Sequence, residues 1–225
     1  MPQITVHHLE NSRSTRILWL LEELEVPYEV KVYARDPRTS RAPVELRDLH
    51  PLGKAPVVTV DGLVLAESGA ILEHLVDGVG QGRLRPDPGT PQAVQCRYWL
   101  HFAEGSLMPP LLLALIFGKL RRAKAPFFIK PVITGVADKV DAQYTSAELE
   151  RLFGFVEQHL GQHPWFAGPE LSIADVQMSY PVEAGLVRAR LDGGHPNIDA
   201  WLARIHERPA YQRALARGGP IAVPL

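Results

Sequence analysis

Apolar residues in the first eighty positions switch repeatedly between the spacing of a strand and the spacing of a helix. Ile4 and Val6 alternate with polar neighbours, which predicts a strand over Gln3–His8. Arg16–Glu25 then carries leucines at helical spacing as far as Pro27, a residue that ends helices. The same reasoning predicts strands at Tyr28–Tyr33, Val57–Val60 and Leu63–Leu65, one or two helical turns at Val44–Leu49, and a helix that begins near Glu67. A β-α-β unit followed by a hairpin and a helix predicts an α/β thioredoxin-like domain.

The segment His50–Leu72 contains the strongest local signals. Asp61-Gly62 separates two apolar runs, a typical β-hairpin turn. Pro56 precedes the first run, and the peptide bond before a proline can be cis. Glu67-Ser68-Gly69 opens the following helix, whose first N–H groups have no partner within the helix. We expect a strand edge with a free backbone facing this helix end, an arrangement that would hold an extended peptide and its carboxylate.

The second part of the chain is predicted to be all-helical. Gly78–Pro91 breaks every periodicity, so we expect one domain over residues 1–80, a linker over 81–91 and a helical domain over 92–225. Ser172-Ile173-Ala174-Asp175 resembles a capping box, with Leu171 placed as the hydrophobic staple. The predicted helices are Gln92–Phe117, interrupted or kinked at Pro109-Pro110, then Ile129–Leu160, Val176–Arg190, Asn197–Arg208 and Ala210–Arg217.

Composition narrows the class of protein. A hydrophobic content of 46%, a charged content of 22% and a net charge of −1 are ordinary for a soluble protein and do not suggest a nucleic-acid partner. Cys96 is the only cysteine, which excludes an internal disulfide framework and a CxxC pair. The N-terminal residues turn polar too early for a secretory signal, and the apolar run Leu107–Leu120 is shorter than a membrane span. We expect a cytoplasmic protein, and no metal site, because no second ligand pair matches His7-His8.

Three passages together resemble the glutathione transferase family. Ser12–Arg16 with the following helix is similar to the first strand–helix turn of the serine-type, theta-like bacterial members. His50–Val57, with Glu67-Ser68 after the hairpin, is similar to the family's glutathione site. Leu171–Asp175 is similar to the capping box of a buried helix in its C-terminal domain. The resemblance implies an enzyme that is usually a homodimer and that uses glutathione as a co-substrate, with no cofactor.

The resemblance also implies roles for individual residues of the glutathione site. Pro56 would be a cis-proline that follows Ala55 and leaves the Val57 backbone to pair with the cysteinyl part of glutathione. Glu67 and Ser68 would bind the γ-glutamyl end. Lys54 would offer its charge to the glycyl carboxylate or to the peptide backbone. Each position also has an ordinary structural alternative: Ser68 as a helix cap, Lys54 as a solvated lysine, Pro56 as a trans-proline.

Ser12 would lie beside the sulfur atom of glutathione. The thiolate is the nucleophile, and because a free thiol has a pKa of roughly 8.5, only a few per cent is ionised at neutral pH. A hydroxyl that donates to the sulfur, helped by the positive end of the helix starting near Ser14, would favour the thiolate. Ser14 and the Asn11 amide compete for this role, and the alternative for Ser12 is a purely structural role as the cap of the helix. Arg13 and Arg16 would contact glutathione or a dimer partner, or form a solvated surface or an internal ion pair.

The helical domain would supply the pocket for a hydrophobic electrophile. Apolar or aromatic side chains at helical spacing are candidates for its lining, although such residues are more often plain core. These candidates are Tyr98, His101, Phe102, Leu107 and Met108. The leading interpretation is conjugation of glutathione to that electrophile. The alternatives are a non-catalytic glutathione-binding or structural protein of the same fold, or a glutathione-dependent peroxidase, isomerase or dehalogenase.

Overall fold

The computed structural model describes residues 1–188 and 194–219. Its sheet has the strand order β2-β1-β3-β4 and is mixed: β1 (Ile4–Leu9) pairs parallel with β2 (Glu29–Tyr33) and antiparallel with β3 (Val57–Val60), which pairs antiparallel with β4 (Leu63–Ala66). The helices of this part are α1 (Thr15–Glu23), α2 (Val44–Leu49) and α3 (Ser68–Asp77). The predicted thioredoxin-like domain is confirmed, and the predicted strands and helices lie within a few residues of the observed ones.

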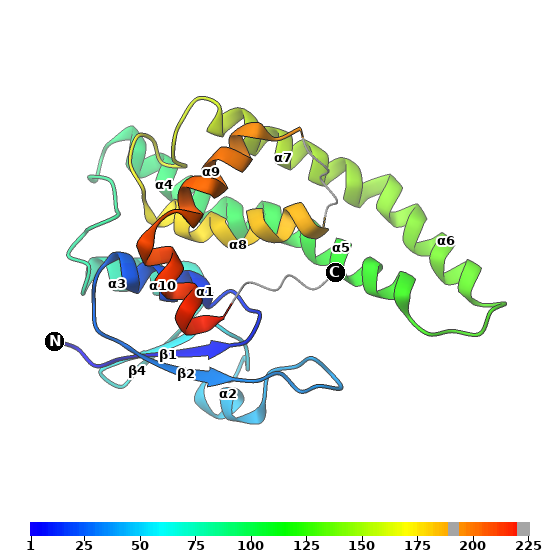
Figure 1. Ribbon diagram of the computed structural model, residues 1–225, viewed down its shortest axis with the longest axis horizontal. Helices are drawn as coiled ribbons and strands as arrows, with labels where there is room; N and C mark the ends of the chain where they lie inside the picture. The colour runs from blue at the N-terminus through cyan, green and yellow to red at the C-terminus, as the bar shows by residue number, and fades with distance from the viewer. Residues whose placement is uncertain (189–193, 220–225) are drawn as a thin grey trace.

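Helices cover both faces of the sheet (Figure 1). α1 and α3 lie on the face toward the helical part, and the side chains of α1 from Thr15 to Glu22 are buried there. α2 covers the other face, where Leu46 packs against Leu9 and Tyr33 in a second, smaller core. The turn between β1 and α1 is thus held between the sheet and the helical part, which fixes the position of Ser12.

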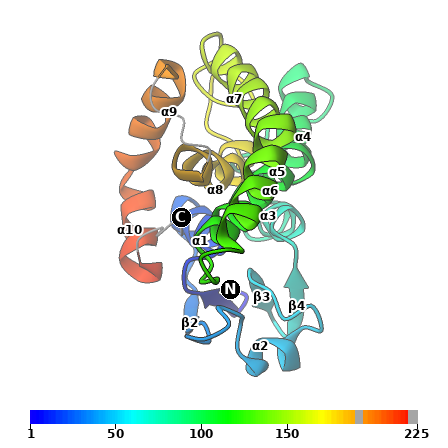
Figure 2. The same cartoon turned by 90° about the vertical axis from the view of Figure 1, so that its right-hand side faces the viewer.

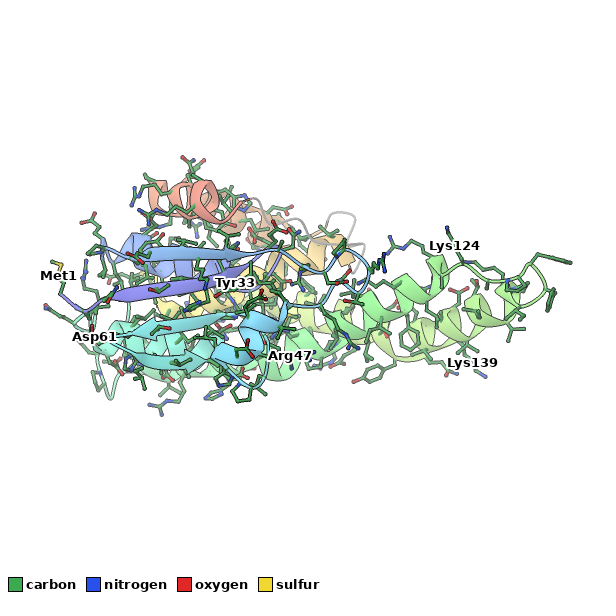
Figure 3. The ribbon with its side chains drawn as sticks, turned by 90° about the horizontal axis from the view of Figure 1, so that it is seen from below. Met1, Tyr33, Arg47, Asp61, Lys124 and Lys139 are labelled. Carbon is green, nitrogen blue, oxygen red and sulfur yellow. The ribbon has the colours of Figure 1, made fainter. Side chains whose placement is uncertain are left out.

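The rest of the described chain is helical, as predicted. Its elements are α4 (Pro91–Phe102), η1 (Ala103–Leu107), α5 (Met108–Arg122), α6 (Lys130–Val140), η2 (Asp141–Thr145), α7 (Ser146–Leu160), α8 (Ile173–Arg188), α9 (Pro196–His206) and α10 (Pro209–Gly218). α5 and α6 form a hairpin that extends beyond the sheet; Lys124 and Lys139 lie on this extension (Figure 3). The last two positions of the predicted helix Val176–Arg190 fall outside the described residues.

Two of these helices contain a π-helical turn. Pro109 and Pro110 do not end the predicted helix Gln92–Phe117, because Pro91–Arg122 is one continuous helix. Instead, α-geometry gives way to the π-turn η1 immediately before them, and both prolines lie in the first turn of α5. A π-turn changes the spacing of donors and acceptors along the helix, so the missing proline N–H groups are accommodated without a break. A second π-turn, η2, joins α6 to α7 and has no comparable signal in the sequence.

By length and composition alone, the helix Pro91–Arg122 could cross a membrane. Core helices of soluble proteins meet the same criterion, and Trp99 and Leu107 of this helix are fully buried in the hydrophobic core. Packing within the protein accounts for the 39% of its most apolar stretch that is buried, whereas Leu112 and Ile116 of the same helix are exposed.

One hydrophobic core joins the sheet part to the helical part. It runs from Ile4 in β1 to Ala214 in α10, and α10 packs directly against α1. Figure 2 shows α10 beside α1, below α9 and above β2. Even the linker-like segment contributes, because Leu84 packs on this core and the Arg83 guanidinium donates to the Leu24 carbonyl at 2.5 Å. The division at residues 80 and 91 therefore stays a prediction.

The capping box at the start of α8 forms as predicted. The Asp175 carboxylate accepts hydrogen bonds from the Ser172 N–H and hydroxyl at 3.0 and 3.1 Å. It also accepts from the Phe166 N–H at 2.9 Å and from the Trp201 indole at 3.0 Å. Burial raises the pKa of Asp175 to about 6, while the four donors act in the opposite direction. Asp175 is thus a structural centre that ties α8 to the preceding loop and to α9.

Candidate functional site

A cleft lies at the end of the sheet where the β1–α1 turn meets the helical part. Two adjoining cavities, of about 510 Å³ and 80 Å³, share Arg13, Leu52, Lys54 and Ala55 in their walls. The larger cavity is also lined by Ser12, Leu112 and Tyr180, and the smaller one by Pro56, Glu67 and Ser68. The cleft therefore brings together most of the residues that the sequence assigned to glutathione and to its sulfur.

The Ala55–Pro56 peptide bond is cis, as expected. The expected strand edge, however, is wrong. β3 lies inside the sheet, and Val57 is paired with His7 of β1 on one side and Ala66 of β4 on the other. Val57 is fully buried, whereas Ala55 lines the cleft. Among the described residues, the Ala55 N–H and C=O make no hydrogen bond, so the free backbone lies two residues before the strand begins at Val57.

Ser68 lies at the start of α3 and is held by a buried arginine. Its hydroxyl oxygen accepts a hydrogen bond from the Arg16 guanidinium at 3.0 Å, which leaves the Ser68 proton free for an acceptor in the cleft. Arg16 is 1% exposed, and it also donates to Glu104 of η1 at 2.8 Å and to the Gln177 carbonyl of α8 at 2.8 Å. Burial lowers the pKa of Arg16, and the charge of Glu104 raises it. The arginine thus connects four helical elements behind the cleft.

Glu67 precedes this helix in an unusual backbone conformation. Its φ is +69°, a region that a residue with a side chain rarely adopts. Such conformations cost about 1–3 kcal/mol and are found preferentially at binding sites. Glu67 makes no capping hydrogen bond with its side chain, and it lines the smaller cavity. The exposed carboxylate is therefore available beside the N–H groups at the start of α3.

The three candidates for the sulfur contact occupy different places. Ser12 lines the cleft, whereas Ser14 lies behind it and is fully buried. Asn11 is exposed, and its carbonyl accepts from Arg35 at 3.0 Å. The Ser12 hydroxyl lies 2.6 Å from the Ser14 hydroxyl and accepts from the Ser14 N–H at 3.2 Å. Ser14 occupies the N-cap position of α1 but makes no capping bond with its side chain.

Behind Ser14 lies a buried histidine that the sequence interpretation did not assign to the site. The Ser14 hydroxyl is 2.9 Å from His8 Nδ1, and His8 Nε2 is 2.8 Å from the Gly218 carbonyl. His8 is 1% exposed. The side chain of its neighbour His7 instead contacts the Tyr33 and Thr59 hydroxyls. The sequence suggests a role for the pair His7-His8 only as metal ligands, and a second ligand pair is missing. No local pattern connects position 8 to position 218.

The wall of the larger cavity carries several positive charges. Lys54 and the arginines Arg13, Arg35, Arg41 and Arg47 line it, and the described lining includes no carboxylate. Arg13 is paired with Glu104 at 2.7 Å, and Arg35 is held by the carbonyls of Glu10, Asn11 and Ser40. Of the alternatives for Arg13 and Arg16, the internal ion pair is the one observed. The remaining charge favours an anionic ligand.

The five candidates for the electrophile pocket do not meet at this cleft. Phe102, Leu107 and Met108 are buried in the hydrophobic core. Tyr98 is 45% exposed and packs against Phe102 and the ring of Phe155. His101 is exposed, and none of the five is among the residues that line the two cavities. In the described chain, the helical part instead contributes Leu112 of α5 and Tyr180 of α8.

Known proteins resemble this chain along nearly its whole length. Residues 1–77 match the glutathione S-transferase N-terminal domain, and residues 120–209 match the glutathione S-transferase C-terminal domain. Glutathione S-transferase 3 of Schizosaccharomyces pombe is 37% identical over 92% of this chain and 84% of its own length. Glutathione S-transferase 1 of Saccharomyces cerevisiae is 35% identical over 94% of this chain and 93% of its own length.

Solved structures give the same result. A glutathione S-transferase from Actinobacillus pleuropneumoniae is 36% identical, with a TM-score of 0.83 over 98% of this chain and 95% of its own. A glutathione transferase family member from Pseudomonas fluorescens, solved with two glutathione bound, is 25% identical, with a TM-score of 0.73 over 95% of this chain and 92% of its own. The chain belongs to the glutathione transferase family.

Proposed function

We propose that this glutathione transferase binds glutathione along the cleft from Ser68 to Ser12 and presents its thiolate to an electrophile beside Leu112 and Tyr180. One observation carries the proposal: a single cleft combines a helix N-terminus whose serine hydroxyl has a proton to donate, an unpaired backbone at a cis-proline and a second hydroxyl at the start of α1. In this arrangement residues 1–80 hold glutathione, and the helical part closes the electrophile side. The protein is cytoplasmic, acts as a homodimer and needs glutathione only as a co-substrate.

The γ-glutamyl end of glutathione fits the smaller cavity. Its carboxylate accepts from the Ser68 hydroxyl and from the first N–H groups of α3, where the helix dipole favours negative charge. Its ammonium group pairs with Glu67. The cysteinyl backbone pairs with Ala55, two residues before the Val57 position that the sequence suggested. The glycyl carboxylate then points toward Lys54 in the positively charged wall of the larger cavity.

This pose brings the sulfur to Ser12 at the N-terminus of α1. A hydroxyl that donates to the sulfur lowers the thiol pKa, and each unit of lowering corresponds to about 1.4 kcal/mol. A charge-assisted hydrogen bond contributes about 1.5–3 kcal/mol, which is enough to ionise most of the bound thiol near neutral pH. The thiolate then attacks the electrophile, and the hydroxyl stabilises the negative charge until the new carbon–sulfur bond forms.

Two serine variants test the proposal. We expect Ser68→Ala to weaken glutathione binding, measured by calorimetry, by at least about tenfold, because it removes a hydrogen bond to a charged group. Ser12→Ala should lower kcat for conjugation with little change in glutathione affinity. Ser146→Ala, at an exposed serine in α7, is the matched control and should change neither quantity. Unchanged binding by Ser68→Ala, or no saturable binding by the wild type, would overturn the proposed site.

A further inference from the structure

Three hydrogen-bonded side chains lead from the cleft into the interior of the protein. Ser12 lines the cleft, its hydroxyl lies 2.6 Å from that of Ser14, and the Ser14 hydroxyl lies 2.9 Å from His8 Nδ1. The chain ends where His8 Nε2 lies 2.8 Å from the Gly218 carbonyl. Each of the three side chains is at most 6% exposed. Water therefore has little access to these three side chains. The protons of their hydrogen bonds are shared among the three side chains alone.

The Gly218 carbonyl fixes one end of the chain. A carbonyl oxygen only accepts hydrogen bonds, so His8 Nε2 carries a proton and donates it. Gly218 can approach this closely because it has no side chain: a Cβ there would lie 3.0 Å from His8 Cε1 and 2.5 Å from Leu18 Cδ1. Gly218 also ends α10, where the helix dipole favours a positive charge on the imidazole.

A neutral His8 sets the direction of both hydroxyls. With its proton on Nε2, His8 offers a lone pair at Nδ1, so the Ser14 hydroxyl donates to His8. Because the Ser14 proton is already used, the hydrogen bond between the two hydroxyls is donated by Ser12 to Ser14. In this state Ser12 has no proton left for a sulfur atom. A neutral His8 therefore favours the thiol of glutathione over its thiolate.

Donation from Ser12 to the sulfur requires both hydrogen bonds of the series Ser12–Ser14–His8 to reverse their direction. If the Ser12 hydroxyl donates to the sulfur, the hydrogen bond between the two hydroxyls must be donated by Ser14. The Ser14 oxygen must then accept a hydrogen bond from His8, so Nδ1 of His8 must carry a proton. Because Nε2 already carries one, His8 must be an imidazolium ion whenever Ser12 stabilises the thiolate.

We propose that His8 accepts the proton of the glutathione thiol through Ser14 and Ser12. The inference rests on the glutathione site proposed above. The S–H bond breaks and its proton passes to Ser12; the Ser12 proton passes to Ser14, and the Ser14 proton forms the Nδ1–H bond of His8. Both serines regain a hydroxyl proton and point toward the sulfur, so the products are a thiolate and an imidazolium. His8 acts on the sulfur only through the two hydroxyls and is a positioning residue.

The surroundings of His8 are consistent with this role. Burial lowers the pKa of His8, whereas the Gly218 carbonyl and the charge of Glu10 raise it. The groups that approach from α1 and α10 are the Ser14 hydroxyl, the Leu18 side chain and the Gly218 backbone, none of which is charged. His8 is therefore neutral in the free protein, and the negative charge of the thiolate is what favours its protonation.

The test measures thiolate and protons together on the wild-type protein. Thiolate formation is followed by its ultraviolet absorbance, and proton release by an indicator dye in weak buffer. Near neutral pH we expect glutathione to form a thiolate with much less than one proton released per thiolate. Selective ¹⁵N labelling of histidines should show one residue becoming doubly protonated with glutathione but not with S-methylglutathione, which has no proton to transfer. Release of one proton per thiolate, with no such histidine, would overturn the relay.

Variants identify the histidine and separate the relay from the binding site. In His8→Asn and in Ser14→Ala, the thiolate fraction at about pH 6.5 should fall at least about tenfold, equivalent to one pKa unit, and the release should rise to one proton per thiolate. His7→Asn is the matched control: it is the adjacent buried histidine, bonded to Tyr33 and Thr59 instead. Failure of the wild type to bind glutathione overturns the proposed function itself. Normal binding with an unchanged pH profile in His8→Asn overturns the relay alone.

Discussion

Asp175 offers a test of how burial and hydrogen bonding compete in this fold. Its carboxylate is fully buried and accepts four hydrogen bonds, two from Ser172 and one each from Phe166 and Trp201. The four donors favour the charged form, but burial has the larger effect and raises the pKa to about 6 from an ordinary value of 3.8. Replacing Asp175 with Asn keeps the shape of the side chain and removes the titration.

The difference in pKa fixes the sign and size of the effect on stability. Between pH 3.8 and about 6 the folded chain holds a proton on Asp175 that the unfolded chain has already lost. The stability contributed by this group is complete below pH 3.8 and is lost as the pH rises through the folded-state value. A shift of about two units corresponds to about 3 kcal/mol. The free energy of unfolding of the wild type, relative to that of Asp175→Asn, should therefore fall by about 3 kcal/mol between about pH 3 and about pH 7.

Urea denaturation of both proteins across this pH range measures the difference. Tryptophan fluorescence is a suitable signal, because the Trp201 indole donates directly to Asp175. The protein concentration is kept fixed, since self-association would shift the apparent stability. If the stability of the wild type relative to Asp175→Asn rises with pH instead, the four donors outweigh burial, and the pKa of Asp175 lies below 3.8 in the folded protein.

Three further predictions concern the cleft and the assembly. Glu104→Gln should lower the free energy of unfolding, measured by urea denaturation, by about 1–2 kcal/mol, because the buried Arg16 loses its charged partner and the partial exposure of Glu104 moderates the cost. No change would mean that the Gln177 carbonyl and the Ser68 hydroxyl are enough to hold the Arg16 guanidinium. Leu112→Ala should raise KM for a hydrophobic electrophile several-fold while His101→Ala leaves it unchanged, as measured by steady-state kinetics; the reverse pattern would restore the pocket suggested by the sequence. Light scattering should give a mass of about 50 kDa, twice that of the 25.0 kDa chain, and a monomer would exclude the homodimer.

Local chemistry made much of the fold predictable. The bounds Val44–Leu49 and Val57–Val60 agree with the structure, because Pro43 and the Asp61-Gly62 turn mark them in the sequence. The capping box at Ser172 was predictable for the same reason, because its two residues, Ser172 and Asp175, are only three positions apart. The order of the strands was not readable. Periodicity reports which residues form a strand, but it does not report whether β3 lies at an edge or between β1 and β4.

The sequence predicted the site residues only where the local turn or helix start places them. Ser12, Pro56 and Ser68 each sit at a turn or helix start that the sequence marks, and the structure brings all three to one cleft. The electrophile side was not predictable, because apolar residues at helical spacing look alike whether they face the core or a cavity. Which face of α5 meets the cleft depends on packing against α8, and that packing exposes Leu112 while burying Met108.

The groups that control the reactive hydroxyl come from the far end of the chain. Ser12 is positioned by its own turn, but the direction of its proton is set by His8, whose tautomer is fixed by a carbonyl 210 residues away. The γ-glutamyl side follows the same logic, because Ser68 is oriented by Arg16, which is held in turn by Glu104 and Gln177 of the helical part. Both hydroxyls of the cleft therefore depend on the docking of the helices onto the sheet. A disturbance of that docking should reduce thiolate formation before it reduces the helix content of the protein.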